Sequence, residues 1–330
     1  MIFHPGILAL LLGSALTTCM LCCSAWEGVR IIHGWDIRSG SENQLALERR
    51  TYLVSTIMGY VMGFQLLSLF LFIYTADTLS PLFIGAMCAA GSLKVNGFGY
   101  PALIVKIVAC LLAGLWLIVN AADNQAYDYP LIRLKYWLLL FIAPVVLAET
   151  TLQGFYLLSL EPNIITSCCS VLFSTGAGSV MSGLFAMPHF RAKAMFFAGA
   201  ALTAAAGLNV YLRGKGAILF AIASLCHFIV STIALISFIS VYFYELPTHH
   251  CPFCLLHQEY GFVGYFLYAA MLTGAVAGTG TGVIEPFRGI PSLRDVVPRM
   301  QRKLALVSLM ATAVFLGITG YSLVFSNLSM

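Results

Sequence analysis

Residues 101–121 read PALIVKIVACLLAGLWLIVNA, and Lys106 is the only charged side chain among them. A helix needs roughly 20 apolar residues to cross the hydrocarbon core of a bilayer, so this segment predicts a membrane-spanning helix. The composition of the whole chain agrees, because 60% of its 330 residues are hydrophobic and 9% are charged. A soluble domain carries about 25% charged residues, and this chain falls far below that.

Eight apolar segments of spanning length occur along the chain. They predict helices at residues 6–26, 52–76, 101–121, 135–160, 190–211, 216–244, 260–281 and 304–326. The short alternating segments of a membrane β-barrel do not occur. We therefore predict an all-α, polytopic integral membrane helical bundle that forms a single transmembrane domain over residues 1–330. The first segment lacks the basic leader of a secretory signal, so we expect an uncleaved helix.

The connections between these helices differ in charge. Thirteen of the 17 basic residues lie in or beside residues 27–51, 122–134, 212–215 and 282–303. Because cytoplasmic loops are enriched in Lys and Arg, we predict that these four connections face the cytoplasm. The outer loops are then residues 77–100, 161–189 and 245–259, and both termini are extracytoplasmic. We expect the membrane to be a bacterial inner (plasma) membrane.

Local signals refine this plan. Ser41-Glu42-Asn43-Gln44 resembles a capping box, which predicts a helix that starts there and runs into the helix at 52–76. Residues 81–93 are apolar but too short to span, and they favour a partial helix or a re-entrant segment. Residues 282–303 contain three prolines among basic residues, and we expect an extended segment near anionic headgroups.

Glycines mark one predicted helix as a packing surface. Gly274, Gly278 and Gly282 recur at intervals of four residues. This spacing places them on one face, where the absence of side chains lets another helix backbone approach closely. We expect this face to serve helix packing.

One outer loop concentrates reactive side chains. Residues 249–257 read HHCPFCLLH, so a Cys-x-x-Cys pair and three histidines occupy nine positions. Thiols on the extracytoplasmic side meet an oxidising compartment, where such a pair can close a disulfide. The other cysteines on the predicted outer side are Cys88, Cys168 and Cys169.

A redox function is the leading interpretation of these cysteines. The helix predicted to start at residue 260 would favour thiolate through its N-terminal amides. Cys251 is then the candidate attacking thiol and Cys254 the resolving one, with Cys168 or Cys169 as exchange partner. A static disulfide between the outer loops explains the same residues, and both interpretations remain open.

This plan resembles that of the membrane thiol oxidoreductases that pass electrons between protein disulfides and quinone. These are the disulfide-bond-forming and vitamin K epoxide reductase families. Cys251-Pro252-Phe253-Cys254 and the pair Cys168-Cys169 are the residues that carry the resemblance. It covers the four-residue motif and the placement of the cysteines, and it implies a quinone as electron acceptor.

A metal site is the alternative interpretation of the same loop. His249, His250 and His257 offer imidazole nitrogens beside the thiols of Cys251 and Cys254. Imidazole and thiolate together suit zinc or copper. Cys168 and Cys169 are candidates to complete four ligands.

Two ionisable residues are expected inside the membrane, where such groups are rare. Glu149 lies near the middle of the helix predicted at 135–160, and His227 lies at similar depth in the helix at 216–244. Together they are candidates for a proton path or a quinone site. A hydrogen bond that fixes helix packing is the alternative. Lys106 is expected to reach the outer membrane face.

Three functions follow from these interpretations. The first is a membrane thiol–disulfide or electron-transfer component with an extracytoplasmic thiol protein as partner. The second is a transporter or metal-handling permease. The third is a structural membrane-anchor subunit whose cysteines join loops within a larger complex. The basic residues are scattered among loops, so no nucleic-acid partner is expected.

Overall fold

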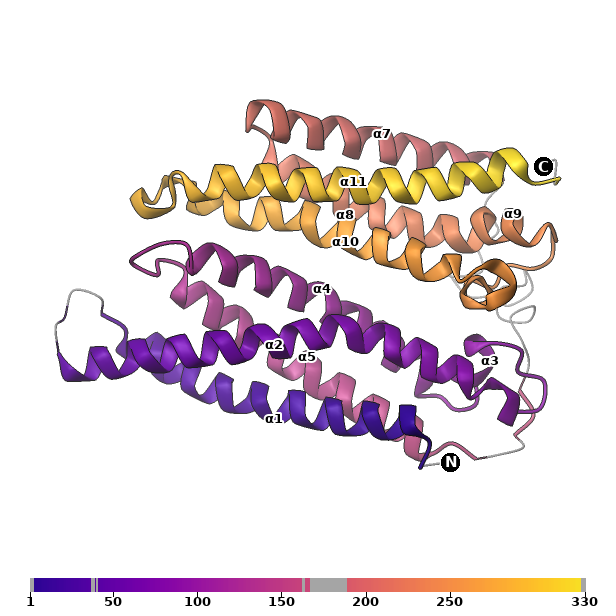
Figure 1. The fold of residues 1–330 in the computed structure, drawn as a ribbon, viewed down its shortest axis with the longest axis horizontal. Coiled ribbons are helices and arrows are strands. Elements are labelled where there is room, and N and C mark those ends of the chain that lie inside the picture. Colours follow the sequence, from indigo (N-terminus) through magenta and orange to yellow (C-terminus); the bar gives the residue numbers. More distant parts are fainter. Residues whose placement is uncertain (1–2, 37–38, 40, 162–163, 167–188, 328–330) are drawn as a thin grey trace. The chain divides into compact units, whose positions relative to one another are not determined.

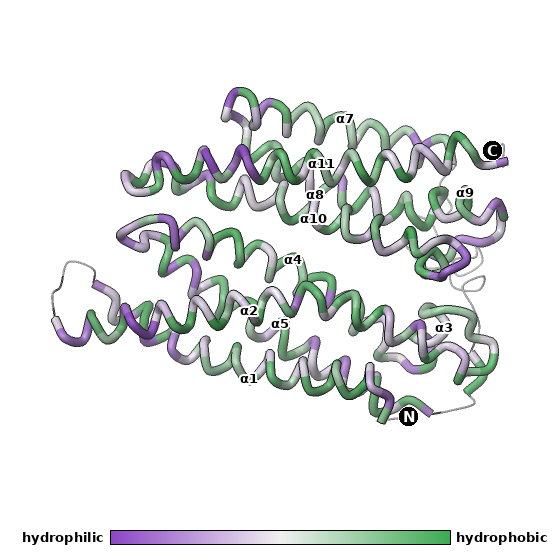
Figure 2. The backbone as a smooth tube through the Cα atoms, viewed as in Figure 1, coloured by the Kyte–Doolittle hydropathy of each residue, from purple (hydrophilic) through white to green (hydrophobic). Residues whose placement is uncertain are grey.

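The computed structural model describes residues 3–36, 39, 41–161, 164–166 and 189–327. This part of the chain is helical and holds no β-strand, apart from one isolated bridge between Ile84 and Ile165. Eight of its helices are long and apolar enough to cross a membrane. The predicted all-α polytopic membrane protein is therefore confirmed, and its helices contact the lipid bilayer. Hydrophobic residues run along the length of these helices, while hydrophilic residues gather at their ends (Figure 2).

The chain divides into two compact units. Unit 1 comprises Met1–Thr75, Val95–Pro162 and Phe287–Val297, and unit 2 comprises Ala76–Lys94, Asn163–Pro286 and Pro298–Met330. The long helices of unit 1 are α1 (Pro5–Gly34), α2 (Glu42–Thr78), α4 (Gly99–Asp123) and α5 (Ile132–Leu158) (Figure 1). Within it, α5 packs against both α1 and α4. Trp116, Leu139 and Met58 are fully buried in its core.

Unit 2 holds the second set of long helices. They are α7 (His189–Arg213), α8 (Ala217–Ala234), α10 (Val263–Ile284) and α11 (Val296–Phe325). A π-helical segment, η2 (Leu235–Ile239), joins α8 to the short helix α9 (Ser240–Tyr244). Helix α8 packs against α7 and α10. The rings of Phe238 and Phe315 pack around Phe196 with centroid separations of 5.8 Å.

Helix α2 begins where the capping signal predicts. The backbone N–H of Gln44 donates to Ser41 Oγ at 3.3 Å, which confirms Ser41 as the capping residue. The side chain of Gln44 does not complete the reciprocal bond of a capping box. Its Oε1 instead accepts from the backbone N–H of Asp36 at 3.1 Å, and this bond ties the start of α2 to the residues that follow α1.

The extended segment predicted for residues 282–303 is wrong. Two 3₁₀ turns, η5 (Glu285–Gly289) and η6 (Pro291–Leu293), follow α10, and α11 already begins at Val296. Pro291 and Pro298 lie in the first turn of their helices, where the missing N–H leaves no bond unmade. The prolines therefore start helical turns here instead of ending them.

The apolar segment within residues 77–100 contains two short helical pieces. They are the 3₁₀ turn η1 (Ser80–Leu82) and α3 (Ala89–Leu93). The partial helix predicted for residues 81–93 is thus present as α3, and all five of its residues are buried.

The glycine face of α10 contacts α8 as the spacing predicts. A Cβ atom at Gly278 would lie 2.4 Å from Ser224 Cβ, and one at Gly282 would lie 2.5 Å from Ala221 Cβ. Real Cβ atoms do not approach this closely, so the two helices rely on glycine at these positions.

Replacing Gly278 with alanine is expected to lower the stability of the protein by about 1–3 kcal/mol, because the added Cβ overpacks the contact with Ser224. Thermal unfolding of the detergent-solubilised chain would measure the loss. Gly317→Ala in α11 is the matched control, since a Cβ there meets no atom within 4 Å. Equal melting temperatures for the two variants would contradict this account of the helix contact.

Candidate metal centre

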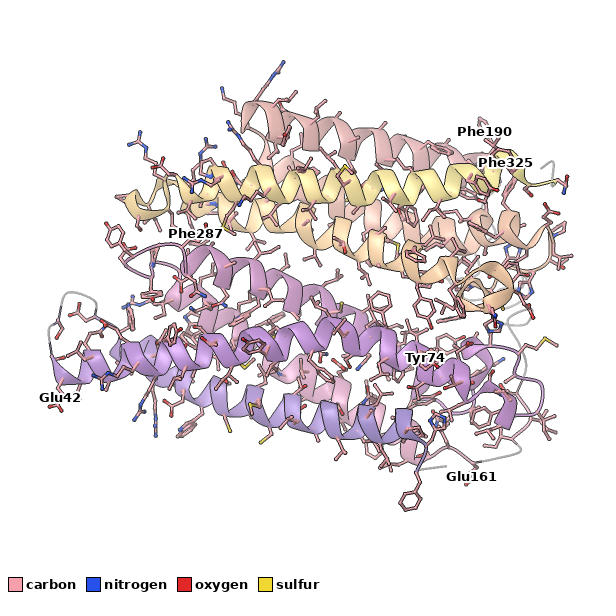
Figure 3. All side chains as sticks on the ribbon, in the orientation of Figure 1. Glu42, Tyr74, Glu161, Phe190, Phe287 and Phe325 are labelled. Atoms are coloured by element: carbon pink, nitrogen blue, oxygen red, sulfur yellow. The ribbon has the colours of Figure 1, made fainter. Side chains whose placement is uncertain are left out.

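Residues 249–257 lie in the connection between α9 and α10, within unit 2. Figure 1 shows this connection at the opposite end of the unit from the turn between α7 and α8. Phe190, near the start of α7, and Phe325, at the end of α11, lie at the same end as the connection (Figure 3). Residues 76–94 also belong to unit 2.

Three thiols meet in this region. The Sγ atoms of Cys88, Cys251 and Cys254 all lie within 4.8 Å of one another, and Cys88 Sγ is 3.5 Å from Cys251 Sγ. Within the described part of the chain, no disulfide joins any of the three. Cys88 is 1% exposed and Cys251 is 0% exposed, whereas Cys254 is only partly buried. Cys88 and Cys251 are therefore enclosed, and Cys254 is the least enclosed residue of the three.

A histidine adds a fourth donor atom. His249 Nε2 lies 3.4 Å from Cys254 Sγ. The His249 ring packs edge-on against Tyr244, with 4.6 Å between ring centroids. Burial lowers the pKa of His249, so the imidazole is neutral near pH 7 and keeps a lone pair for a ligand.

The 3₁₀ turn explains how Cys251 and Cys254 come together. Pro252 precedes η3 (Phe253–Leu256) with φ −71°. Cys254 is the second residue of η3, and Cys251 lies two residues before the turn begins, so the two thiols meet where the chain enters η3. Two tyrosines hold the backbone of this turn. Tyr244 donates to the carbonyl of Cys251 and Tyr268 donates to that of Pro252, each at 2.5 Å.

Cys88 is positioned by the start of α3. It is the N-cap residue of this helix, with extended φ and ψ. Asp77 Oδ1, in the last turn of α2, accepts from the backbone N–H of Ala89 at 3.0 Å. The same oxygen lies 3.0 Å from His257 Nε2. Asp77 thus links the residue after Cys88 to the end of the Cys251–Cys254 turn.

The backbone near α3 is fixed from a second direction. The N–H of Ile84 donates to Ile164 O at 3.1 Å, and that of Thr166 donates to Ile84 O at 2.9 Å. Thr166 Oγ1 also donates to Gly91 O in α3 at 3.1 Å. These bonds satisfy backbone groups that no long helix would pair.

The three sulfurs lie close enough to share a metal ion, and His249 Nε2 contacts one of them. Zinc bond lengths to sulfur and nitrogen imply about 3.8 Å between two ligand sulfurs and about 3.6 Å between a sulfur and a nitrogen. The observed 3.5 Å and 3.4 Å are close to these values. Hydrogen bonding to Cys251 and then Cys88, together with burial, raises the pKa of Cys254 far above its ordinary value. Deprotonation of Cys254 is therefore costly in the free cluster, and a cation bound among the sulfurs would favour the thiolate.

The predicted histidines take different positions. Of the three proposed metal ligands, His249 contacts the thiols. His250 Nδ1 lies 3.1 Å from Ile236 O in the π-helical segment η2, and His257 contacts Asp77. Cys88, which the sequence placed only among the other cysteines of the predicted outer side, supplies the third sulfur. The only sequence signal that connected Cys88 with residues 249–257 was the prediction that both lie in outer loops.

The redox interpretation also assigned roles to Cys168, Cys169 and Cys251. Cys168 and Cys169 lie outside the described residues. The predicted activation of Cys251 by a following helix is wrong, because α10 begins at Val263 with Phe262 as its N-cap. Cys251 is also fully enclosed. Cys254 is the less enclosed residue of the pair.

Glu149 belongs to a buried network in unit 1. Its Oε1 accepts from Lys106 Nζ at 2.5 Å, and its Oε2 accepts from Gln65 Nε2. Lys106 also donates to Gln153 Oε1 at 2.8 Å, and Gln153 Nε2 donates to Ser14 Oγ at 3.1 Å. Lys106 is 1% exposed, so the expectation that it reaches the membrane face is wrong. The network links all four long helices of unit 1.

His227 belongs to unit 2 and lines a small cavity there. Thr203, Ser308, Thr312 and Met271 are among its neighbours in the cavity wall. The cavity volume is about 20 Å³, which holds about one water molecule. His227 Nδ1 is buried and has no hydrogen-bond partner among the described residues. The site as described therefore suits a water-sized group, and the pairing of His227 with Glu149 stays a prediction.

Comparison of the chain with protein-family models, with curated protein sequences and with solved structures finds no match.

Replacing Lys106 with methionine is expected to destabilise the protein by about 3–5 kcal/mol, because Glu149 would remain buried without its cation. Adding Glu149→Gln should restore much of the loss, since no uncompensated charge is then left. Unfolding of the solubilised chain measures both effects. The control is Lys215→Met at an exposed position, which should leave stability unchanged. A double variant as unstable as the single one would contradict this account.

Proposed function

We propose that this integral membrane protein binds one zinc ion through Cys88, Cys251, Cys254 and His249. The observation that carries the proposal is the spacing of the donor atoms. Three sulfurs lie within 4.8 Å of one another, and His249 Nε2 lies 3.4 Å from one of them. Three thiolates with a neighbouring imidazole suit zinc better than the hard cations, which prefer oxygen.

The role of the ion is structural. Four protein ligands close the coordination sphere of zinc, whereas catalytic zinc keeps one position open for water or substrate. The ion would fasten α3 to the turn η3, and these elements are five and four residues long. Helices this short gain little from their own hydrogen bonds. Metal coordination supplies folding free energy to such segments.

The site is proposed to face the extracytoplasmic side. Arg213 and Lys215 flank the turn between α7 and α8, and Arg299, Arg302 and Lys303 lie in the first turns of α11. All five belong to the end of unit 2 opposite the cluster. The excess of basic residues on cytoplasmic loops supports this orientation, with both chain termini outside and a bacterial inner membrane as the location.

This function fits a structural membrane subunit better than a permease. Cys88 and Cys251 are enclosed, and their enclosure favours retention of the ion over its release. The fastened segment gives the outer end of unit 2 a fixed shape. Other subunits of a membrane complex are the partners that such a surface would serve.

Thiol–disulfide exchange is the second candidate. The observation that favours it is the partial exposure of Cys254 beside the thiols of Cys88 and Cys251. In this reaction Cys254 attacks the disulfide of an extracytoplasmic protein, and a cluster thiol then displaces the reduced partner. Two cluster thiols are oxidised to one disulfide while the partner disulfide becomes two thiols. The electron pair thus leaves the cluster for the partner.

Elemental analysis of the purified full-length chain tests the proposal. We expect about one zinc ion per chain, and its loss in Cys88→Ser and His249→Ala. His250→Ala is the matched control, since His250 contacts a backbone carbonyl and should leave zinc content unchanged. Cys110→Ser tests whether removing any buried thiol has the same effect. Cys110 is buried in unit 1.

Alkylation of the thiols without reductant separates the two candidates. Under the zinc proposal, all three cluster thiols are alkylated after a chelator removes the metal. A metal-free chain in which two of them resist alkylation until reductant is added would overturn the proposal and favour exchange. Copper in place of zinc would overturn the assignment of the metal.

A further inference from the structure

Asp77 and His257 form a contact that involves none of the four proposed zinc ligands. His257 Nε2 lies 3.0 Å from Asp77 Oδ1, and 180 positions separate the two residues in the sequence. The two side chains are 27% and 20% exposed, so both are partly buried. The contact therefore joins two distant segments of unit 2, and each of these segments also carries thiols of the cluster.

On one side, Asp77 fixes the backbone next to Cys88. Its Oδ1 accepts from the backbone N–H of Ala89, the first residue of α3, at 3.0 Å. The first N–H groups of a helix have no partner within that helix, so this bond satisfies one of them. The carbonyl of Cys88 accepts from the N–H of Gly91 at 3.0 Å. Cys88 thus lies in a helix start that Asp77 caps.

On the other side, His257 is bonded to the turn that carries Cys254. It directly follows η3, and its backbone N–H donates to the carbonyl of Cys254 at 3.1 Å. Its own carbonyl accepts from the N–H groups of Tyr260 and Phe262, each at 3.2 Å. The backbone of His257 is therefore held from both directions, and its position depends on that of the turn.

One carboxylate oxygen thus connects the two segments that supply the thiols. Cys88 and Cys251 meet across 163 positions of sequence, and ordering such distant segments around an ion costs free energy unless other contacts fix them beforehand. Groups outside the coordination sphere that orient metal ligands change metal affinity by about 10–100-fold when they are replaced. Asp77 and His257 are in the position to have this effect.

We propose that Asp77 and His257 are positioning residues of the zinc site and that their contact slows release of the ion. This inference rests on the proposed function. Neither residue is a ligand. Their contact holds the segment of Cys88 against the turn of Cys251 and Cys254, so that the three sulfurs stay together when one bond to the ion breaks. Without the contact, the two segments separate more readily and the ion leaves faster.

The rate of zinc transfer from the purified full-length chain to a coloured chelator, 4-(2-pyridylazo)resorcinol, tests the proposal. Asp77→Ala is expected to release zinc about tenfold faster, at the lower end of the range because the contact is partly exposed. His257→Ala should have a smaller effect, since the bond from Asp77 to Ala89 remains. The double variant should release zinc no faster than Asp77→Ala, because both substitutions remove the same contact.

Conservative variants separate positioning from a general loss of structure. Asp77→Asn keeps a side-chain oxygen that accepts hydrogen bonds, and His257→Gln keeps a side-chain N–H that donates one, so both should release zinc at close to the wild-type rate. The matched control is Glu259→Gln, which removes a charge at an exposed position of the same connection. Thermal unfolding of the metal-free chains shows whether each variant is folded at the temperature of the assay.

Failure of the inference can be told from failure of the proposed function. A zinc-loaded wild-type chain whose Asp77→Ala and His257→Ala variants release zinc at the wild-type rate overturns the inference and leaves the zinc site in place. A wild-type chain without zinc overturns both. Additive effects in the double variant contradict a shared contact, and an effect of Glu259→Gln as large as that of His257→Ala reduces it to local charge. Either result also overturns the inference.

Discussion

Within a bilayer no water is present to satisfy a polar group, and this constraint shapes both units of the protein. Every polar atom placed at membrane depth must find its partner in the chain. Helices meet the requirement for the backbone. For side chains, unit 1 meets it by pairing Lys106 with Glu149 and Lys135 with Asp123, at 2.5 and 2.6 Å. All four side chains are at most 1% exposed, so each charge is neutralised where it is buried.

A related constraint, the burial of backbone groups away from water, explains the hydrogen bonds around the thiol cluster. Residues 79–94 and 245–262 lack long helices, so their backbone groups need other partners. Asp77 accepts from Ala89, Thr166 donates to Gly91, and two tyrosines cap the carbonyls of Cys251 and Pro252. Each bond satisfies a group that would otherwise lie unpaired. Together they fix the positions of the thiols before any ligand binds, and preorganisation of this kind strengthens binding.

Local sequence patterns predicted the helices well because a membrane span depends on apolar length alone. They failed where a contact joins distant residues. The residues around Lys106 in the sequence do not indicate that its partner Glu149 lies on another helix. Those around Cys88 do not indicate that Cys251 lies beside it. Prolines were misleading for a different reason. Their effect depends on position within a turn, and Pro298 lies in the first turn of α11, where proline is tolerated.

The number of thiols bears on the choice between metal and disulfide. A disulfide joins two sulfurs, so any bridge within the cluster would leave a third thiol in contact with it. That thiol would be positioned to attack the bridge, and the pairing would not be unique. A tetrahedral ion would instead use all three sulfurs. It would also account for His249, whose Nε2 contacts Cys254, whereas His250 and His257 contact other groups. The metal centre thus explains four side chains where a disulfide explains two.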